Sequence, residues 1–391
     1  MILPASPHIA GRPIDTAQPP LIVAELSANH NGSLEKAQAL IAACAAAGAD
    51  AIKVQTYTAD SLTLPLKQPP FQITQGPWAG QTFHELYRKA ALPLEWTQRL
   101  ARCATDHGLI FFSTPFDEAG VDFLEATIDP PAYKIASYEI GHRPLLERVV
   151  ATGKPTILST GMATPNEIER AVQRFKQAGV PLFLLKCVSE YPAKAAGFNL
   201  RSMQTLREQF DVLVGLSDHT LTDAIALGAT ALGACIIEKH VCLSRGEGGV
   251  DSHFSIDPNE LARLVRGVRD LHAGLGSPLL EEMGADAPER SHRRSIFVSQ
   301  PIARGEEFTA GNLSVVRPGN GLDPWRWPEV LGTRAASNLA PGQPLSEDAI
   351  EGFNPASTRD ARENAPGAPR RLPAQIQVAR RTLQASPPAT T

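Results

Sequence analysis

Short runs of β-branched and aromatic residues alternate with longer stretches rich in Ala, Leu and Glu between residues 21 and 275. The short runs are typical of buried strands, and the longer stretches carry the apolar spacing of helices. The predicted strands span residues 21–26, 51–56, 109–114, 132–137, 156–160, 182–188, 212–217 and 235–240. Eight strands, each followed by a helix, predict an α/β fold, a (β/α)8 TIM barrel rather than an open doubly wound sheet.

The pattern changes at both ends of this region and once inside it. We expect an N-terminal arm at 1–20, the barrel at 21–278 and a charged linker at 279–294. Short strands with Gly-bearing turns predict a small α+β domain at 295–353, and the Pro- and Arg-rich segment 354–391 predicts a disordered tail. Residues 57–92 add a Pro-rich loop and a short helix after the second strand, and a loop of that length usually covers a site.

Composition and charge exclude several classes of protein. The 391 residues carry 37 Lys and Arg against 41 Asp and Glu, so the formal net charge is -4, whereas nucleic-acid binding requires a basic surface. We expect no membrane span, because apolar stretches fall short of the ~20 residues required, and no secretory signal. The five cysteines form no CxxC framework. A cytoplasmic protein that binds small molecules is expected.

Polar side chains stand at the end of nearly every predicted strand. In a (β/α)8 barrel, functional side chains project from the carboxyl ends of the strands. The candidates in chain order are Glu25, Ser27, Asn29, His30, Lys53, Gln55, Lys134, Ser137, Glu139, Ser159, Lys186, Ser189, Tyr191, Ser217, Asp218, His219, Glu238, Lys239 and His240. Such groups would be costly in a closed apolar core, so a solvated site at the barrel mouth is predicted.

Lys53 and Lys134 occupy corresponding places in two strands. Either lysine alone is equally well explained as a cation that extends from a strand end toward solvent. Serines end several of the other strands, at Ser137, Ser159, Ser189 and Ser217. Together, two cations and several hydroxyls favour a cradle for phosphate and carboxylate groups.

His219 and His240 end two neighbouring strands. One histidine in such a place is more often structural, but two imidazoles can share a divalent cation and leave positions open for water or substrate. The Gly-rich run after His240 contains Asp251, which could hydrogen-bond a polyol or an amide; a flexible loop is the alternative. Arg317 precedes a turn in VRPGNG, and the pattern alone favours a solvated arginine.

Several segments together resemble the sialic acid synthase (NeuB-like) family of phosphoenolpyruvate-condensing enzymes. They are AELSANHNGSLEKA, AIKVQTYTAD, FSTPFD, YKIASYEI, KPTILSTGMAT, KCVSEYPA, VGLSDHT and IIEKH. SIFVSQPIARGEEFTAGNLSVVRPGNG resembles the antifreeze-like (SAF) domain that ends those enzymes, so the similarity runs from about residue 20 to 353. GGVDSHFSIDP and FHELYRKAALPLEW resemble the pseudaminic acid synthases within the family, whereas neuraminate synthases typically carry a GPDH-type sequence at the former place.

The resemblance implies a metal-dependent condensation of phosphoenolpyruvate with 2,4-diacetamido-2,4,6-trideoxy-altropyranose, giving pseudaminic acid and phosphate. C3 of phosphoenolpyruvate would attack the sugar aldehyde, water would add at C2, and phosphate would leave. An N-acetylneuraminate or legionaminate synthase is the alternative, with the same chemistry and another amino sugar. A non-catalytic carbohydrate-binding protein is a remote alternative, because sugar binding requires neither the two lysines nor the two histidines.

The resemblance also implies roles for individual residues. The phosphoenolpyruvate contacts match Lys53, Lys134, Ser137, Ser159 and Ser217, with Ser189 where neuraminate synthases commonly have Asn. The catalytic acids match Glu25, Glu139 and Glu238, and the ligands of Mn²⁺ or Mg²⁺ match His219 and His240. The sugar contacts match Gln55, Tyr191, Asp251 and Arg317, and Glu238 also matches a position on the sugar side. Arg317 matches an arginine that reaches into the partner subunit's barrel, which implies a domain-swapped homodimer.

Overall fold

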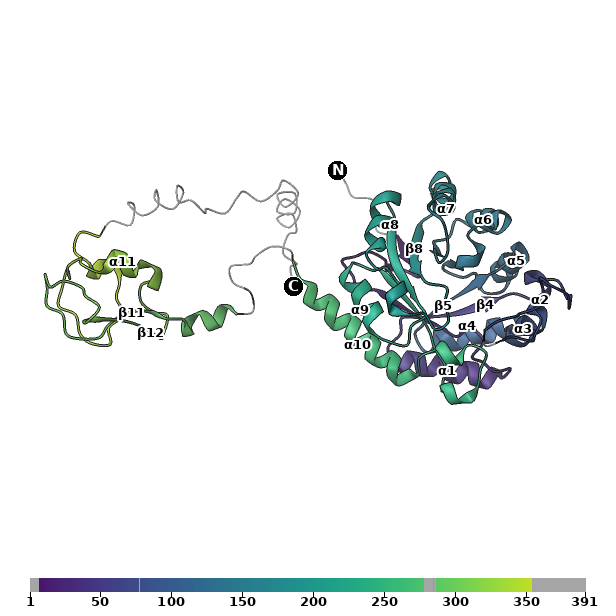
Figure 1. Ribbon diagram of the computed structural model, residues 1–391, viewed down its shortest axis with the longest axis horizontal. Helices are drawn as coiled ribbons and strands as arrows, with labels where there is room; N and C mark the ends of the chain where they lie inside the picture. Colours follow the sequence, from purple (N-terminus) through teal and green to yellow (C-terminus); the bar gives the residue numbers. More distant parts are fainter. Residues whose placement is uncertain (1–6, 77, 278–283, 285, 354–391) are drawn as a thin grey trace. The chain divides into compact units, whose positions relative to one another are not determined.

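The chain folds into two compact units, Met1–Ser277 and Pro278–Thr391, in a computed structural model (Figure 1). The structure describes residues 7–76, 78–277, 284 and 286–353. Among these residues, no helix combines the length and the hydrophobicity that crossing a membrane requires. The predicted tail at 354–391 and part of the predicted linker lie outside the described residues.

The first unit is a closed barrel of eight parallel strands, which confirms the predicted fold. The strands are β3 (Leu21–Glu25), β4 (Ala51–Thr56), β5 (Ile110–Pro115), β6 (Tyr133–Ile135), β7 (Thr156–Ser159), β8 (Leu182–Cys187), β9 (Leu213–Asp218) and β10 (Ile236–His240). Each pairs with the next in the chain, and β10 pairs with β3 to close the barrel. The predicted strand bounds differ from these by one or two residues at most.

Helices surround the strands (Figure 1). They are α1 (Leu34–Ala46), α4 (Thr97–Asp106), α5 (Glu118–Thr127), α6 (Arg143–Val150), α7 (Pro165–Ala178), α8 (Ser202–Phe210), α9 (Ala224–Ala231) and α10 (Pro258–Leu275). Their apolar faces pack on the outward-facing strand residues, among them Ile22, Val54 and Leu184. Side-chain oxygens cap several of these helices at their N-termini; Thr164, for example, accepts a hydrogen bond from the backbone of Glu167.

The inside of the barrel is apolar only toward the amino ends of the strands. Inward-facing Val23, Phe112 and Phe183 form a second apolar cluster there. Ile9 and Ile14 belong to the same cluster, and the two-stranded hairpin β1 (His8–Ile9) and β2 (Arg12–Pro13) lies beside them. The segment before the first barrel strand therefore packs against the amino end of the barrel, and the polar residues are left at the opposite end.

The insertion after β4 contains two short helices, α2 (Ala59–Leu62) and α3 (Phe83–Ala90), the second of which was predicted. Its Trp78 makes an edge-to-face contact with His253, with ring centroids 5.8 Å apart. The ring of His30, just after β3, lies 3.2 Å from Ala90 O. These contacts place the insertion beside the loops that follow β3 and β10, at the carboxyl end of the barrel.

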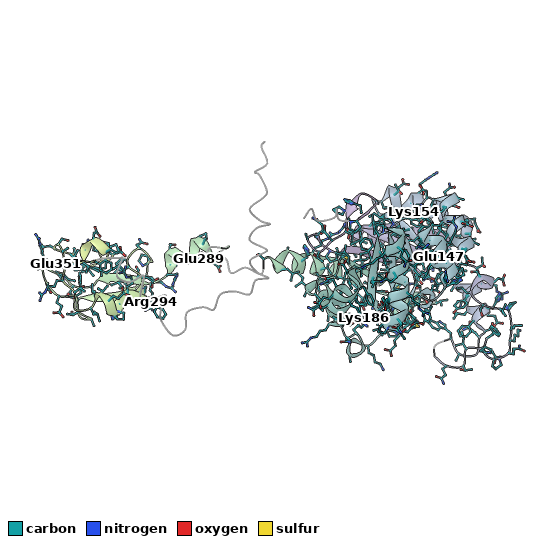
Figure 2. The ribbon with its side chains drawn as sticks, turned by 90° about the horizontal axis from the view of Figure 1, so that it is seen from above. Glu147, Lys154, Lys186, Glu289, Arg294 and Glu351 are labelled. Atoms are coloured by element: carbon teal, nitrogen blue, oxygen red, sulfur yellow. The ribbon has the colours of Figure 1, made fainter. Side chains whose placement is uncertain are left out.

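The second unit has its own small core. Its strands β11 (Ser295–Val298) and β12 (Leu313–Val316) pair in antiparallel fashion, and a short helix α11 (Trp327–Val330) follows. Ile296, Phe308 and Val330 are buried in this core. Figure 2 labels Glu289, Arg294 and Glu351 in this unit. Arg317 directly follows β12 and is exposed.

Candidate active site

Polar side chains line the carboxyl end of the barrel. Alternate residues of a strand face the same side, so the residues that continue the inward-facing series of Val23, Phe112 and Phe183 also face the lumen. The inward-facing polar residues are Glu25, Lys53, Gln55, Thr114, Lys134, Ser159, Cys187, Ser217, Glu238 and His240. Apart from Gln55, all of them are buried. All eight strands of the barrel thus contribute polar groups to one place.

A network of charges joins the two predicted lysines. Lys53 Nζ lies 2.5 Å from Glu25 Oε2 and 3.7 Å from Glu238 Oε1, and it donates to Thr114 Oγ1 at 3.0 Å. Lys134 Nζ lies 3.6 Å from the same oxygen of Glu238. The structure therefore brings Lys53, Lys134, Glu25 and Glu238 together, as the sequence predicted. Thr114 was not predicted, because a threonine within a strand gives no functional signal of its own.

The charges of this network do not cancel. Burial raises the pKa of Glu25, and the nearby Lys53 only partly opposes this. Burial also opposes charge on Glu238, but Lys134 and Lys53 outweigh it, so the pKa of Glu238 is lowered. Burial would lower the pKa of Lys53, but Glu238 and Glu25 more than compensate and raise it, whereas Lys134 is less well compensated and its pKa is lowered. One firmly ionised acid between two lysines leaves room for an anionic ligand.

Three serine hydroxyls lie beside the lysines with few protein partners. Ser137 Oγ accepts a hydrogen bond from the backbone of Gly161 at 3.0 Å. Ser159 Oγ and Ser189 Oγ are buried without a hydrogen-bond partner among the described residues. A Cβ atom at Gly161 would lie 2.4 Å from Ser189 Oγ and 2.9 Å from Ser137 Oγ, so these two hydroxyls converge there. Buried hydroxyls without partners are costly, and phosphate oxygens would satisfy them.

The two predicted metal ligands are neighbours. The rings of His219 and His240 have centroids 5.2 Å apart. His219 Nδ1 lies 2.8 Å from the carbonyl oxygen of Val188, which can only accept, and the thiol of Cys187 also hydrogen-bonds the His219 side chain. His240 Nδ1 is buried without a partner among the described residues. Burial, helped by the charge on His219, holds the pKa of His240 well below its usual range, which keeps its ring in the neutral form that binds metal.

This pair fits a cation whose remaining ligands come from water or substrate. No group of three or more His, Cys, Asp or Glu side chains suited to a metal occurs within the described part of the chain. Catalytic metal sites keep positions open for substrate, and a bound cation would give His240 Nδ1 its missing partner. The donor set is therefore suited to a site that is completed when substrate binds.

Aromatic side chains pack around the histidines. Tyr191 lies 4.5 Å from His219 and 4.9 Å from Phe254, measured between ring centroids. Phe254 also lies 4.9 Å from His240. Tyr191 was predicted on the sugar side. Phe254 was not predicted. Its place as an aromatic residue in the polar, Gly-rich loop after β10 could have indicated a role in the site.

A chain of hydrogen bonds links Asp251 to the acids of the site. Gln55 Nε2 donates to Glu25 Oε1 at 2.9 Å and lies 3.1 Å from Ser27 Oγ. Ser27 Oγ in turn donates to Asp251 Oδ2 in a short hydrogen bond. Burial raises the pKa of Asp251, and the hydrogen bond from Ser27 opposes this. Gln55 and Asp251 thus lie on one side of the site; Ser27, whose hydroxyl joins them, had no predicted role.

Asn29 holds the loop that carries Asp251. Its Nδ2 donates to Val241 O at 2.7 Å and to Ser255 Oγ at 2.9 Å. The same loop passes so close to Asn29 at Gly249 that a Cβ atom there would lie 3.0 Å from Asn29 Oδ1. The Gly-rich run is therefore packed tightly against the segment after β3 and is not a free loop, in contrast to the alternative interpretation of its glycines.

Glu139 and Arg317 are not joined to this network by a described hydrogen bond or ion pair. Glu139 is half-buried in the short 3-10 helix after β6, and Lys134 affects it only through its charge. Burial raises the pKa of Glu139 to about 7, and Lys134 opposes the shift. Arg317 belongs to the second unit.

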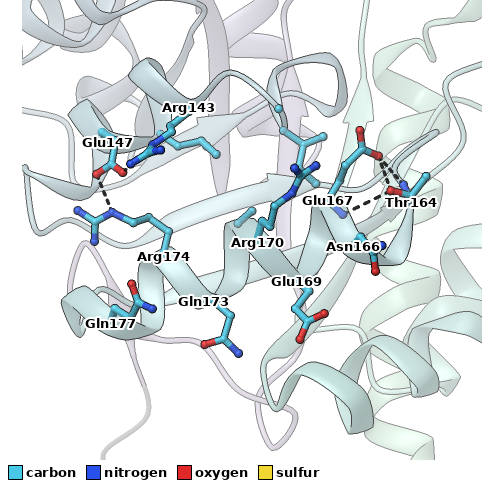
Figure 3. A pocket seen from close by; sticks show the side chains of 14 residues that line it. Arg143, Glu147, Thr164, Asn166, Glu167, Glu169, Arg170, Gln173, Arg174 and Gln177 are labelled. Atoms are coloured by element: carbon cyan, nitrogen blue, oxygen red, sulfur yellow. Dashed lines mark hydrogen bonds and ion pairs between the residues drawn. The ribbon is translucent and has the colours of Figure 1, made fainter.

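A separate groove of the barrel unit lies between α6 and α7 (Figure 3). Its volume is about 980 Å³, and no predicted site residue lines it. Arg143, Arg170 and Arg174 stand against Glu147, Glu167 and Glu169 along it, and Arg174 pairs with Glu147 at 2.6 Å. Its charges are thus balanced by the protein itself, which distinguishes it from the lysine-rich mouth of the barrel.

Comparison with protein families assigns both units. Residues 40–279 match the model of the NeuB family, and residues 293–351 match that of the SAF domain. The chain belongs to the NeuB family. The resemblance inferred from the strand-end motifs is thereby confirmed.

Individual NeuB-family proteins are similar to nearly the whole described chain. The pseudaminic acid synthase of Campylobacter jejuni strain 81-176 is 41% identical over 83% of this chain and 95% of its own length. That of Helicobacter pylori is 41% identical over 85% and 98%. The N,N'-diacetyllegionaminic acid synthase of Legionella pneumophila is 35% identical over 84% and 94%. The crystal structure of the Leptospira borgpetersenii N-acetylneuraminic acid synthetase matches with a TM-score of 0.66 and 33% identity, covering 72% of this chain and 94% of that one.

Proposed function

We propose that the protein is a pseudaminic acid synthase, which condenses phosphoenolpyruvate with 2,4-diacetamido-2,4,6-trideoxy-altropyranose to give pseudaminic acid and phosphate. The observation that carries the chemistry is the pair of buried lysines, Lys53 and Lys134, around Glu238 beside partnerless serine hydroxyls. The higher identity to pseudaminic acid synthases, 41% against 35% for the legionaminic acid synthases, supports the choice of sugar.

Phosphoenolpyruvate is the ligand that suits the lysine side of the mouth. Lys53 and Lys134 neutralise its phosphate and carboxylate, and their donors replace the water that these anions lose. Ser137, Ser159, Ser189 and Ser217 donate to the remaining oxygens. Because the site carries a surplus of positive charge before substrate binds, it also stabilises phosphate as a leaving group.

A divalent cation, Mn²⁺ or Mg²⁺, is proposed at His219 and His240. When bound there, it supplies a Lewis acid that can polarise a substrate oxygen. Because Nδ1 of His219 is held by Val188 O, Nε2 is its nitrogen for the cation, and His240 is kept neutral by burial. His240 therefore needs no loss of a proton to act as a ligand, whereas burial of His219 is outweighed by Cys187, which raises the pKa of His219.

The carbon chemistry follows from the polarity of the two substrates. C3 of phosphoenolpyruvate attacks the aldehyde carbon of the open-chain sugar, and the aldehyde oxygen takes up a proton. Positive charge then develops at C2, where the carboxylate of Glu238 stabilises it, and Glu25 or Glu238 assists the addition of water. The resulting hemiketal loses phosphate by cleavage of its C–O bond. Glu139, whose pKa is about 7, can hold or release a proton at working pH.

The sugar is proposed to bind among Gln55, Tyr191 and Asp251. These side chains offer an amide, a phenol and a carboxylate, which suit hydroxyl and acetamido groups. Arg317 is the fourth sugar contact in this proposal, contributed by the small domain of a partner subunit in a domain-swapped homodimer. We place the reaction in the cytoplasm, where phosphoenolpyruvate is made.

The test is phosphate release from phosphoenolpyruvate with Mn²⁺ and each candidate sugar in parallel. We expect turnover with the altro sugar, and none after removal of the metal with a chelator. Lys134→Met should abolish turnover, while Lys154→Met, a matched change at a partly exposed ion pair before β7, should not. Comparable turnover with N-acetylmannosamine or the diacetamido manno sugar would replace the assignment by a neuraminate or legionaminate synthase. Sugar binding without turnover would favour the carbohydrate-binding alternative.

A further inference from the structure

A buried ion pair lies directly next to both predicted metal ligands in the sequence. Asp218 precedes His219, and Lys239 precedes His240. Asp218 and Lys239 stand opposite each other on the paired strands β9 and β10, and Lys239 Nζ lies 2.7 Å from Asp218 Oδ2. Each residue is only 1% exposed.

This pair faces away from the barrel lumen. Ile237, two residues before Lys239 in β10, and Val241, directly after β10, belong to the core between strands and helices. Leu216, two residues before Asp218, belongs to the same core. Side chains at alternate positions share a face of the strand. Neither Asp218 nor Lys239 can therefore touch a substrate in the lumen, and any effect on the reaction must pass through other residues.

Lys239 also holds the turn that carries His219. Its Nζ donates to Thr220 O in a short hydrogen bond and lies 3.3 Å from Thr220 Oγ1 and 3.4 Å from Thr222 O. Asp218 Oδ1 accepts from the backbone of Thr220 at 2.8 Å. The residues on both sides of His219 are thus tied to the strand position just before His240.

Stability alone is a weak reason for such a pair. The cost of removing two charges from water often equals or exceeds their attraction, so apolar residues in their place are frequently as stable. What apolar residues would not reproduce is a directional link from one strand end to the carbonyl and hydroxyl groups of the neighbouring turn. That link fixes the backbone positions from which both imidazoles extend.

We propose that Lys239 and Asp218 are positioning residues that set the placement of His219 relative to His240 and thereby the affinity of the site for a divalent cation. The inference rests on the proposed function in one respect, the cation site at the two histidines. It assigns to the pair no contact with substrate.

The test measures Mn²⁺ binding to the full-length protein, by the electron paramagnetic resonance signal of free Mn²⁺, without substrate. Lys239→Met keeps the length and bulk of the side chain and removes the ammonium group. We expect its Kd for Mn²⁺ to rise by roughly 10- to 100-fold, as when the partners of metal ligands are removed. Half-saturation of activity by Mn²⁺ should shift by the same factor, while kcat at saturating Mn²⁺ changes less. Lys154→Met should bind Mn²⁺ as the wild type does.

A second variant separates positioning from folding. Lys239→Met leaves Asp218 buried and unpaired, so its melting temperature should fall. The double variant Asp218→Asn with Lys239→Met removes both charges; it should recover much of the melting temperature and still bind Mn²⁺ weakly. If neither folds, Thr220→Val removes only one hydroxyl contact of Lys239 and should raise the Kd by a smaller factor than Lys239→Met does.

The outcomes distinguish this inference from the proposed function. The positioning role would be overturned if a folded variant of Lys239 or Asp218 bound Mn²⁺ as tightly as the wild type. If those variants do not fold, wild-type affinity in Thr220→Val would overturn it. Either result would leave the cation site intact. In that case His240→Ala should still abolish binding. Failure of the wild-type protein to bind Mn²⁺ both alone and with phosphoenolpyruvate present would overturn the cation site and, with it, the positioning role.

Discussion

Glu139 is the acid of the candidate site whose charge changes near neutral pH. Its usual pKa of 4.5 is raised to about 7 by burial, and Lys134 opposes the shift only in part. The other titratable groups that face it are the phenols of Tyr87 and Tyr138, which are neutral in this range and whose own pKa values are raised. The protonation of this residue therefore depends on the fold.

The stability of Glu139→Gln relative to the wild type should depend on pH. The folded protein holds a proton on Glu139 up to about pH 7, whereas the unfolded chain releases it near 4.5, so the wild-type free energy of unfolding falls as pH rises through this window. Glutamine has no proton to lose. At pH 8.5 the variant should therefore be more stable than the wild type by about 1–3 kcal/mol, and near pH 4 the two should differ little.

Urea unfolding of metal-free protein at both pH values measures this difference. Glu306→Gln, the same change in the second unit, which has its own core, serves as the control. A stability difference between Glu139→Gln and the wild type that is the same at pH 4 and 8.5 would contradict the raised pKa.

The residues that face the barrel lumen were predictable from the sequence. The alternation of side chains along a strand and the polar residues at its end can both be recognised within a few neighbouring residues. Lys53 and Lys134 each follow an apolar strand residue by two positions, so their direction was fixed once the strands were located. Ser27 and Asn29 were noticed only as polar residues, because their roles depend on Asp251, Val241 and other residues more than 200 positions away. Such contacts carry no periodic signal in the chain.

At the scale of elements, two glycines set how closely the loops of the site approach each other. A Cβ atom at Gly161, after β7, would lie 2.4 Å from Ser189 Oγ. A Cβ atom at Gly249, after β10, would lie 2.4 Å from Ser252 Oγ and 2.6 Å from Asn31 Oδ1. Substitution at either position must displace these side chains or the loops that carry them, and the two loops serve different substrates in the proposed reaction.

Gly161→Ala should raise the KM for phosphoenolpyruvate, and Gly249→Ala should raise the KM for the sugar, each by roughly 10- to 100-fold. The first separates the hydroxyls of the phosphate cradle, and the second displaces the loop that carries Asp251. Gly274→Ala, where a Cβ atom meets nothing within 4 Å, is the matched control and should change neither value. Steady-state kinetics with one substrate varied at a time measures the split. Equal effects of both variants on both substrates would contradict separate loops for the two ligands.

The bounds of the elements were predicted best where hydrophobic runs end sharply. The strand at 51–56 was predicted at its observed bounds, whereas β6 ends two residues before the predicted 137. The difference arises because Ser137–Glu139 form a 3-10 helix there, which turns Ser137 toward the backbone of Gly161. In AYKIASYE the residue pattern of a strand continues past Ile135, where strand pairing stops. A hydrogen bond to the distant loop at Gly161 determines where the strand ends, and this bond leaves no mark in the local sequence.

At the scale of the whole molecule, the barrel and the small domain have separate apolar cores. Each unit can therefore keep its fold while a side chain of the other is changed. Arg317 is exposed on the small domain and Lys134 is buried in the barrel, so a substitution at one should not disturb the fold of the other unit. Function, in the proposed homodimer, requires both residues in one site.

Mixing two inactive variants therefore tests the domain-swapped arrangement. Lys134→Ala lacks a phosphate contact and Arg317→Ala lacks the sugar contact, so each homodimer should be nearly inactive. In a mixed dimer, the intact barrel of the Arg317→Ala chain receives the intact Arg317 of the Lys134→Ala chain, and one of the two sites works. After the dimers dissociate and reassociate in an equal mixture, about a quarter of wild-type activity should return. Phosphate release measures the recovery, and each variant mixed with itself is the control. If Arg317 instead serves the barrel of its own chain, no mixture will contain a complete site, and activity will not return.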